Sequence, residues 1–174
     1  DTGRIASRIE IQPDGDILTT LFGADGLRDS YVVQDVSDSR NWSVLSESFN
    51  DKGQRIAQRF DMDDGGVRTI LFDFEGKRLS QKTDTQTNGD ILTTIFGPDG
   101  VRDSLMVQDV SDSRGWDVQS VVYNEAGQPM DQRFDLDNGD VRTIVYSYDG
   151  GRLTQKVETQ PDGEVIVRQV VPDL

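Results

Sequence analysis

Residues 15–20 read GDILTT, and residues 89–94 read GDILTT again, an offset of 89 − 15 = 74 positions. The offset extends far beyond this stretch. Aligning residues 11–90 with residues 85–164 gives 46 identities in 80 positions. Self-similarity at a fixed period is the sequence signature of a repeat architecture. The sequence therefore predicts a tandem duplication of a 74-residue unit.

A shorter repeat lies inside the long one and consists of an aromatic residue followed four positions later by glycine. Its members are Phe22/Gly26, Phe49/Gly53, Phe72/Gly76, Phe96/Gly100, Tyr123/Gly127 and Tyr146/Gly150. The steps from glycine to glycine are 27, 23, 24, 27 and 23 residues, so three hairpin-sized units fill each long repeat.

The segments between these glycines have the alternation of β-strands. Residues 17–22 alternate between two faces, and residues 67–72 and 141–146 follow the same template. Runs rich in β-branched and aromatic residues favour a pleated strand. Asp-Gly and Asn-Gly pairs, as at residues 14–15 and 88–89, separate the runs. Such pairs indicate tight hairpin turns because Gly and Asn tolerate positive φ.

The expected fold class is all-β, an antiparallel β-meander built from tandem β-hairpin repeats in an elongated or curled sheet. Six strands per long repeat give about fourteen strands in all. The connections are too short for parallel pairing, which needs a dozen or more linking residues. We expect one continuous array: the end of a preceding repeat at 1–14, long repeats at 15–88 and 89–162, and a further unit or terminal strand at 163–174. Apolar residues on one face of many strands predict a sheet with one wet face.

Composition excludes several function classes. The chain has 18 basic and 32 acidic residues, a net charge of −14, and neither cysteine nor histidine. Phosphate binding depends on Lys and Arg, so nucleic acid is not an expected partner. The commonest general base near neutral pH and any thiol nucleophile are absent. No apolar run approaches the ~20 residues of a membrane-spanning helix, so no membrane insertion is expected.

The units resemble YD repeats, also called RHS repeats, whose pattern is a Tyr-Asp pair, two variable residues, Gly, Arg and an aliphatic residue. The nearest match runs from Phe72 to Leu79, and others run from Phe49 to Ile56 and from Tyr146 to Leu153, each with one extra residue between Gly and Arg. The resemblance implies β-hairpin strips that form shells or stalks on bacterial surface proteins and toxins and are not themselves catalytic. The acidic, Cys-free composition also resembles bacterial proteins exported by type I secretion, many of which bind calcium.

The longest and most polar connection occurs once per long repeat, at residues 34–42 and 108–116. Functional loops tend to be of this kind. A Trp beside Asp and Arg suggests a glycan site, with candidate residues Asp38, Arg40, Trp42, Asp112, Arg114 and Trp116. The alternative is structural: Ser37 and Asp38 bond within their own turn, and Trp42 packs on the sheet.

Acidic clusters after two strands are candidate calcium ligands, namely Asp61, Asp63, Asp135 and Asp137. Calcium takes six to eight oxygen ligands. The complete EF-hand pattern is absent, since the twelfth position counted from Asp61 is Phe72 where a Glu belongs. An ordinary strand end followed by a turn is the alternative. No other cofactor is expected.

These observations favour a non-catalytic structural segment, a stalk, spacer or shell, of a larger bacterial protein that is secreted or held at the cell surface. Its expected partners are neighbouring repeats or domains of the same parent protein. The alternative function is an adhesin module that binds glycans or another surface, assisted by calcium. We predict no catalytic residues and no enzyme activity. Unpaired edges at 4–11 and 164–170 predict edge-strand self-association.

Overall fold

The computed structural model describes residues 5–170, which form strands and connections without a helix. The fourteen strands are β1 (Ser7–Ile11), β2 (Ile17–Phe22), β3 (Arg28–Gln34), β4 (Trp42–Phe49), β5 (Arg55–Met62), β6 (Val67–Glu75), β7 (Arg78–Thr85), β8 (Ile91–Phe96), β9 (Arg102–Gln108), β10 (Val118–Tyr123), β11 (Pro129–Asp135), β12 (Val141–Asp149), β13 (Arg152–Thr159) and β14 (Val165–Gln169). Within this range there is accordingly no helix of the length and apolarity that crossing a membrane requires.

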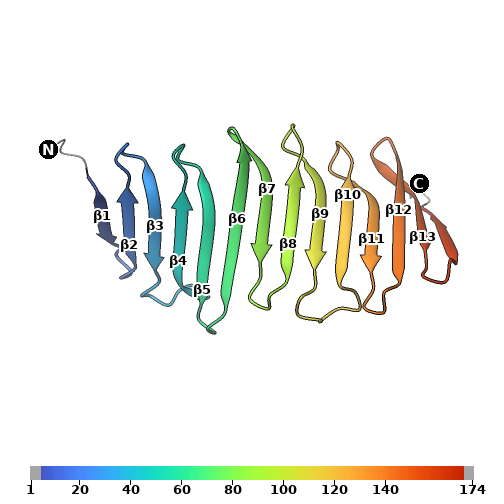
Figure 1. Ribbon diagram of the computed structural model, residues 1–174, viewed down its shortest axis with the longest axis horizontal. Coiled ribbons are helices and arrows are strands. Elements are labelled where there is room, and N and C mark those ends of the chain that lie inside the picture. Colours follow the sequence, from blue (N-terminus) through green and yellow to red (C-terminus); the bar gives the residue numbers. More distant parts are fainter. Residues whose placement is uncertain (1–4, 171–174) are drawn as a thin grey trace.

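All fourteen strands belong to one open sheet in which spatial order equals chain order. Every neighbouring pair is antiparallel, as between β6 and β7, where Ile70 lies opposite Asp84. Figure 1 shows the strands side by side in a single elongated layer, with the first and last strands at opposite ends of the sheet. The predicted antiparallel meander of about fourteen strands is confirmed.

Most hairpins close with the same turn, for which the β1–β2 connection is an example. The Gln12 N–H donates to the Asp16 carbonyl at 2.8 Å, and the Gly15 N–H donates back to the Gln12 carbonyl at 3.0 Å. Gly15 has φ +97°, which a residue with a side chain rarely adopts. The Asp14 carboxylate accepts from the Asp16 N–H at 3.1 Å and so stabilises the turn locally. The Asp-Gly signal therefore has a direct physical cause.

A register shift of one residue recurs beside every second turn, beginning between Leu21 and Phe22. Each shift is a β-bulge, which re-aims the side chains that follow it. After such bulges, Arg28 lies over the ring of Phe49 at 5.3 Å and Arg55 lies over the ring of Phe72 at 5.0 Å. Each arginine thus stacks on the aromatic residue of the next hairpin unit, which links successive units.

The core is thin and lies on one face of the sheet. Its buried apolar residues are Val33, Ile70, Val121, Phe134 and Ile144. Among the described strands, each contacts only the strands before and after it, so no second layer covers either face. The prediction of one wet face was wrong in this respect, because both faces remain partly open to solvent.

The long repeat is visible as a period of six strands. Residues 17–22 of β2 correspond to residues 91–96 of β8, so β2–β7 and β8–β13 are equivalent sets. Within the six-strand period, β1 is equivalent to β7 and β13, and β14 is equivalent to β2 and β8. The predicted boundary segments 1–14 and 163–174 include residues 1–4 and 171–174, which lie outside the described residues.

Candidate functional site

The longest connections join β3 to β4 and β9 to β10. Both lie at the same ends of the strands, along the lower side of the sheet in Figure 1. Each folds against the turn that precedes the neighbouring strand β2 or β8. We call each resulting cluster a clasp. The first clasp consists of Asp16, Asp35, Ser37, Arg40 and Trp42, and the second of Asp90, Asp109, Ser111, Arg114 and Trp116.

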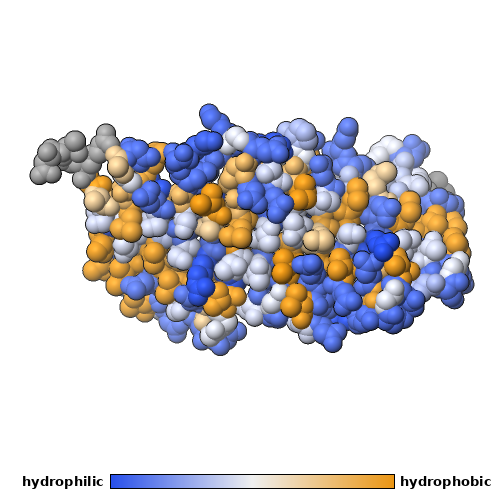
Figure 2. Space-filling view, in the orientation of Figure 1, coloured by the Kyte–Doolittle hydropathy of each residue, from blue (hydrophilic) through white to orange (hydrophobic). Residues whose placement is uncertain are grey.

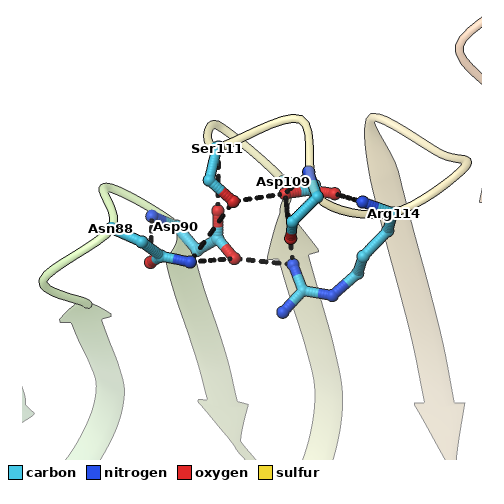
Figure 3. Close-up of polar contacts among 6 residues, drawn as sticks. Asn88, Asp90, Asp109, Ser111 and Arg114 are labelled. Carbon is cyan, nitrogen blue, oxygen red and sulfur yellow. Dashed lines mark hydrogen bonds and ion pairs between the residues drawn. The ribbon is translucent and has the colours of Figure 1, made fainter.

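One aspartate in each clasp shapes its own connection. In the second clasp, the Asp109 carboxylate accepts hydrogen bonds from the Ser111 hydroxyl at 2.9 Å, the Ser113 N–H at 3.2 Å and the Arg114 N–H at 2.5 Å (Figure 3). Asp112 sits at the apex of this connection with φ +53°, a conformation that Asp tolerates better than most residues. The connection is therefore an ordered turn around a carboxylate.

The second aspartate joins the connection to the neighbouring hairpin. Asp90 is fully buried and accepts from the Ser111 N–H at 3.0 Å, the Asn88 side-chain amide at 3.0 Å and the Arg114 guanidinium at 2.6 Å (Figure 3). Arg114 also lies 3.3 Å from Asp109, so one cation serves both carboxylates. A buried carboxylate requires such partners because an unpaired buried charge is very costly.

The first clasp repeats this arrangement around Asp16. The Ser37 N–H donates to Asp16 at 3.0 Å, and the Arg40 guanidinium forms an ion pair with it. Arg40 also lies 3.3 Å from Asp35. The bond from Arg40, followed by that from Ser37, lowers the pKa of Asp16 from 3.8 to about 2. The same guanidinium contact, set against desolvation, raises the pKa of Arg40.

The carboxyl pKa values in the second clasp are also shifted downward. Burial acts to raise the pKa of Asp90, but the bonds from Ser111, Arg114 and Asn88 outweigh it and lower that pKa below its ordinary value. Burial likewise opposes the bonds from Ser113 and Ser111 at Asp109, whose pKa is also lowered. Carboxylates held ionised by fixed donors are poor general bases, since an effective base has a pKa near the working pH.

The tryptophans lie beneath the arginines of the clasps. The Arg40 guanidinium carbon is 5.0 Å from the centroid of the Trp42 ring, and Arg114 is 5.1 Å from that of Trp116. Trp42 meets Phe60 edge to face with a centroid separation of 6.1 Å. One face of each indole is thus covered by a cation that is already held by two carboxylates. Stacking a sugar on that face would require the arginine to move.

A shallow hollow of about 300 Å³ lies beside the first clasp and is lined by residues that include Asp16, Arg40 and Trp42. The equivalent hollow at the second clasp, of about 440 Å³, is lined by residues that include Asp90 and Arg114. Both are lined by side-chain amide and guanidinium groups that can bond to a polar ligand, whereas the carboxylates of Asp16 and Asp90 are buried. The repeated hollow is the feature of this site that suits a bound molecule.

The structure brings two of the three predicted ligand residues of each repeat together, Arg40 with Trp42 and Arg114 with Trp116. Asp38 and Asp112 instead occupy exposed turn positions with positive φ. Sequence reasoning missed Asp16 and Asp90. A signal was present, because a Gly-Asp pair stands before the apolar strand in both long repeats, but it reads as ordinary turn chemistry.

The predicted calcium residues occupy two different environments. Asp61 forms an ion pair with Arg59 at 2.8 Å, and Asp135 forms one with Arg133 at 2.7 Å. Partial desolvation of the exposed residue Asp63, followed by the nearby carboxylates Asp38 and Asp35, raises its pKa. The pKa of Asp137 is raised in the same way, by partial desolvation and then by the carboxylates of Asp112 and Asp117. Residues 5–170 contain no group of three or more acidic side chains placed to hold a metal ion.

Comparisons with known proteins give no family. No family model matches the chain, and no curated protein matches it. Among solved structures, a crystal structure of TcdB2-TccC3-Cdc42 matches at 15% identity and a TM-score of 0.46, covering 92% of this chain and 9% of the other. A porin-like protein from Bacteroides uniformis matches at 12% identity and a TM-score of 0.30, covering 93% and 92%. At these scores neither likeness bears on function. The chain spans about a tenth of the first of these proteins.

Proposed function

We propose that this chain is a non-catalytic structural segment, a stalk, spacer or shell, of a larger bacterial protein that is secreted or held at the cell surface. The observation that carries the proposal is the six-strand period of one open sheet. The edge strands β1 and β14 are equivalent to β7 and β8, and each of these internal strands pairs with a neighbour on both sides. Further repeats can therefore add at either end without any change of pairing. The resemblance to YD repeats is part of this proposal.

The period sets a length. Strands in a sheet lie about 4.8 Å apart, so each 74-residue repeat of six strands adds roughly 29 Å. In a repeat array, each unit contacts only its neighbours, so length grows linearly with copy number. Partners in this role are the adjoining repeats or domains of the parent protein.

Small-angle scattering tests this proposal. A variant carrying a third copy of residues 15–88 inserted after residue 88 keeps the turn sequences and the strand phase. We expect its maximum dimension to exceed that of the parent chain by about 29 Å with an unchanged cross-section. A particle that thickens or becomes rounder while keeping its length contradicts the proposal. The parent chain, measured over a dilution series, is the control for association.

A second candidate function is a module that binds glycans or another surface, and the repeated hollow beside the clasps favours it. Trp42 lines the first hollow together with carboxylate and guanidinium groups. A glycan array read with the wild-type chain and with Trp42→Ala and Trp116→Ala tests it. Signals that fall in both variants support binding at the clasps. Signals that are absent, or unchanged in the variants, dispose of it.

A further inference from the structure

The two faces of the sheet differ in how far their own side chains shield their apolar residues from solvent. We call the face that carries the buried core the aromatic face. Its apolar residues are covered by long side chains: Arg142 lies 4.3 Å from the ring centroid of Phe134, and Arg55 lies 5.0 Å from that of Phe72. Long charged side chains can lay their apolar stems on such rings while their heads stay in water. This face needs no further cover.

The opposite face, which we call the aliphatic face, leaves its apolar residues open. On internal strands, where each residue has strand neighbours on both sides, its exposed members are Leu21, Leu71, Ile95, Met106, Val122 and Val145. They are 36–51% exposed, whereas the five core residues of the aromatic face are 5–7% exposed. Their exposure therefore does not arise from a free sheet edge. Figure 2 shows apolar patches distributed along the length of the sheet, with polar groups between them.

Polar and apolar side chains alternate across the strands of the aliphatic face between β8 and β12. Ser104 lies between Ile95 and Val122 in the cross-strand ladder, and Asp131 lies between Val122 and Val145. Between β8 and β12, apolar side chains thus alternate with polar ones at every second strand, a spacing of roughly 10 Å. The short Ser104 side chain leaves a gap between Ile95 and Val122 into which a side chain of a facing sheet can insert.

Charge on the aliphatic face is compensated in part, because Asp73 and Asp131 of this face have no ion pair among the described residues, whereas two other aspartates do. Arg59 pairs with Asp61 at 2.8 Å, and Arg133 pairs with Asp135 at 2.7 Å, each along its own strand. The strands from β2 to β12 stand nearly upright beside one another in Figure 1, with little change of direction from strand to strand. Wide sheets normally accumulate a strong twist, and flat ones are typically stabilised by stacking or by side-chain ladders.

We propose that the aliphatic face binds the aliphatic face of a second copy of this chain, forming a face-to-face dimer. Fourteen strands span about 67 Å and five central residues per strand span about 17 Å, so each face offers roughly 1,100 Å². Full overlap would remove about 2,300 Å² from water in total, and a stable specific interface needs about 1,200–2,000 Å². Partial overlap is therefore sufficient. This inference is independent of the proposed structural role.

Sedimentation equilibrium from about 1 to 100 μM tests the dimer. We expect the wild-type chain to reach twice its 19.4 kDa mass. The variant Val122→Arg with Val145→Arg places two long cations on the aliphatic face, and we expect it to weaken the dimer at least tenfold. The matched control is Val36→Arg with Val110→Arg, which makes the same charge change in the exposed connections. A second variant, Leu21→Arg with Leu71→Arg, repeats the test in the other long repeat.

Edge pairing between β1 and β14 of different copies is the rival outcome and has its own variant. The Val170 N–H donates to the Thr154 carbonyl at 2.8 Å, and the Phe22 N–H donates to the Ala6 carbonyl at 3.0 Å. Because bonding alternates along a strand, the N–H groups of Val167 and Ile9 point away from the sheet. Proline at both positions blocks edge pairing while sparing the existing ladder. We expect Ile9→Pro with Val167→Pro to remain dimeric.

Three results would overturn the proposal: a monomer throughout the concentration range, a dimer that survives the arginine variants of the aliphatic face, or a dimer lost in the proline variant. Circular dichroism establishes that each variant is folded. Raising salt from about 0.05 to 0.5 M should strengthen the dimer, because the net charge of −14 on each copy opposes association and salt screens it. A dimer weakened by salt contradicts an apolar interface.

Discussion

Arg114 donates a 2.6 Å hydrogen bond to the buried Asp90 and so joins the connection after β9 to the residue that precedes β8. Arg40 and Asp16 form the same link 74 residues earlier. A single-layer sheet has little core with which to hold a long connection. Here buried carboxylates and fixed donors hold it instead, which makes the clasps sensitive to pH.

Acid should destabilise the clasps through Asp16 and Asp90. Both carboxyl groups have folded-state pKa values below the ordinary 3.8, about 2 for Asp16. A lowered pKa contributes stability that is present above the unfolded-state value and lost as pH falls through the folded-state value. We expect the free energy of unfolding of Asp16→Asn with Asp90→Asn to be lower than wild type at pH 7, with the gap starting to narrow below about pH 4 and still narrowing at about pH 2.

Urea titrations at pH 7, 4 and 2 measure this effect. The matched control is Asp51→Asn with Asp149→Asn, which removes the same charge at two exposed positions, one in a turn and one at the end of β12. A gap that stays constant with pH would show that the two buried aspartates do not stabilise the fold as carboxylates.

The opposite sign is expected for Asp63 and Asp137. Partial desolvation and neighbouring carboxylates raise the folded-state pKa values of these two exposed residues. A raised pKa contributes stability below the unfolded-state value that is lost as pH rises through the folded-state value. Asp63→Asn with Asp137→Asn should therefore unfold at a higher urea concentration than wild type at pH 7, and the advantage should shrink toward pH 3. A lower urea midpoint for the variant at pH 7 would show that the ionised carboxylates of Asp63 and Asp137 do not destabilise the fold.

Glycines in turns should differ sharply in their tolerance of a side chain. Gly139 has φ +83°, where an alanine side chain is strained, so Gly139→Ala should cost about 1–2 kcal/mol. Gly115 lacks a positive φ, and a Cβ there meets nothing within 4 Å. Gly115→Ala should be neutral or stabilise by up to ~1 kcal/mol, by restricting the unfolded chain. Denaturant midpoints measure both, and equal effects would refute the turn assignment.

The fold could be predicted from the sequence because its signals are local. The alternation at residues 17–22 and the Asp-Gly pairs specify strands and reversals without knowledge of distant contacts, and short connections leave antiparallel pairing as the outcome. The clasps could be predicted only in part. Arg114 and Asp90 are 24 residues apart and meet only after β8 and β9 have aligned. The second open face was missed because alternation does not reveal whether anything covers the apolar side.

Calcium removal should leave the thermal midpoint unchanged. Asp61 and Asp135 already pair with Arg59 and Arg133, which leaves them poorly available as ligands. A melt followed by circular dichroism with EDTA, compared with one in added calcium, measures this. A midpoint raised by calcium in the wild type but not in Asp63→Asn with Asp137→Asn would instead place a metal beside those carboxylates.

Removing one whole long repeat should leave a folded, shorter sheet. Deleting residues 15–88 joins Asp14 to Gly89 and retains 174 − 74 = 100 residues, with β1 followed by β8–β14. β1 then pairs with β8 as it now pairs with β2, because β2 and β8 are equivalent. Pairings fall from thirteen to seven, so cooperativity and Tm should fall while the circular dichroism spectrum per residue is kept. Deleting residues 15–52 is the control. It removes half of the six-strand period and places β1 beside β5, a pairing found nowhere in the sheet, so its Tm should fall below that of the 74-residue deletion.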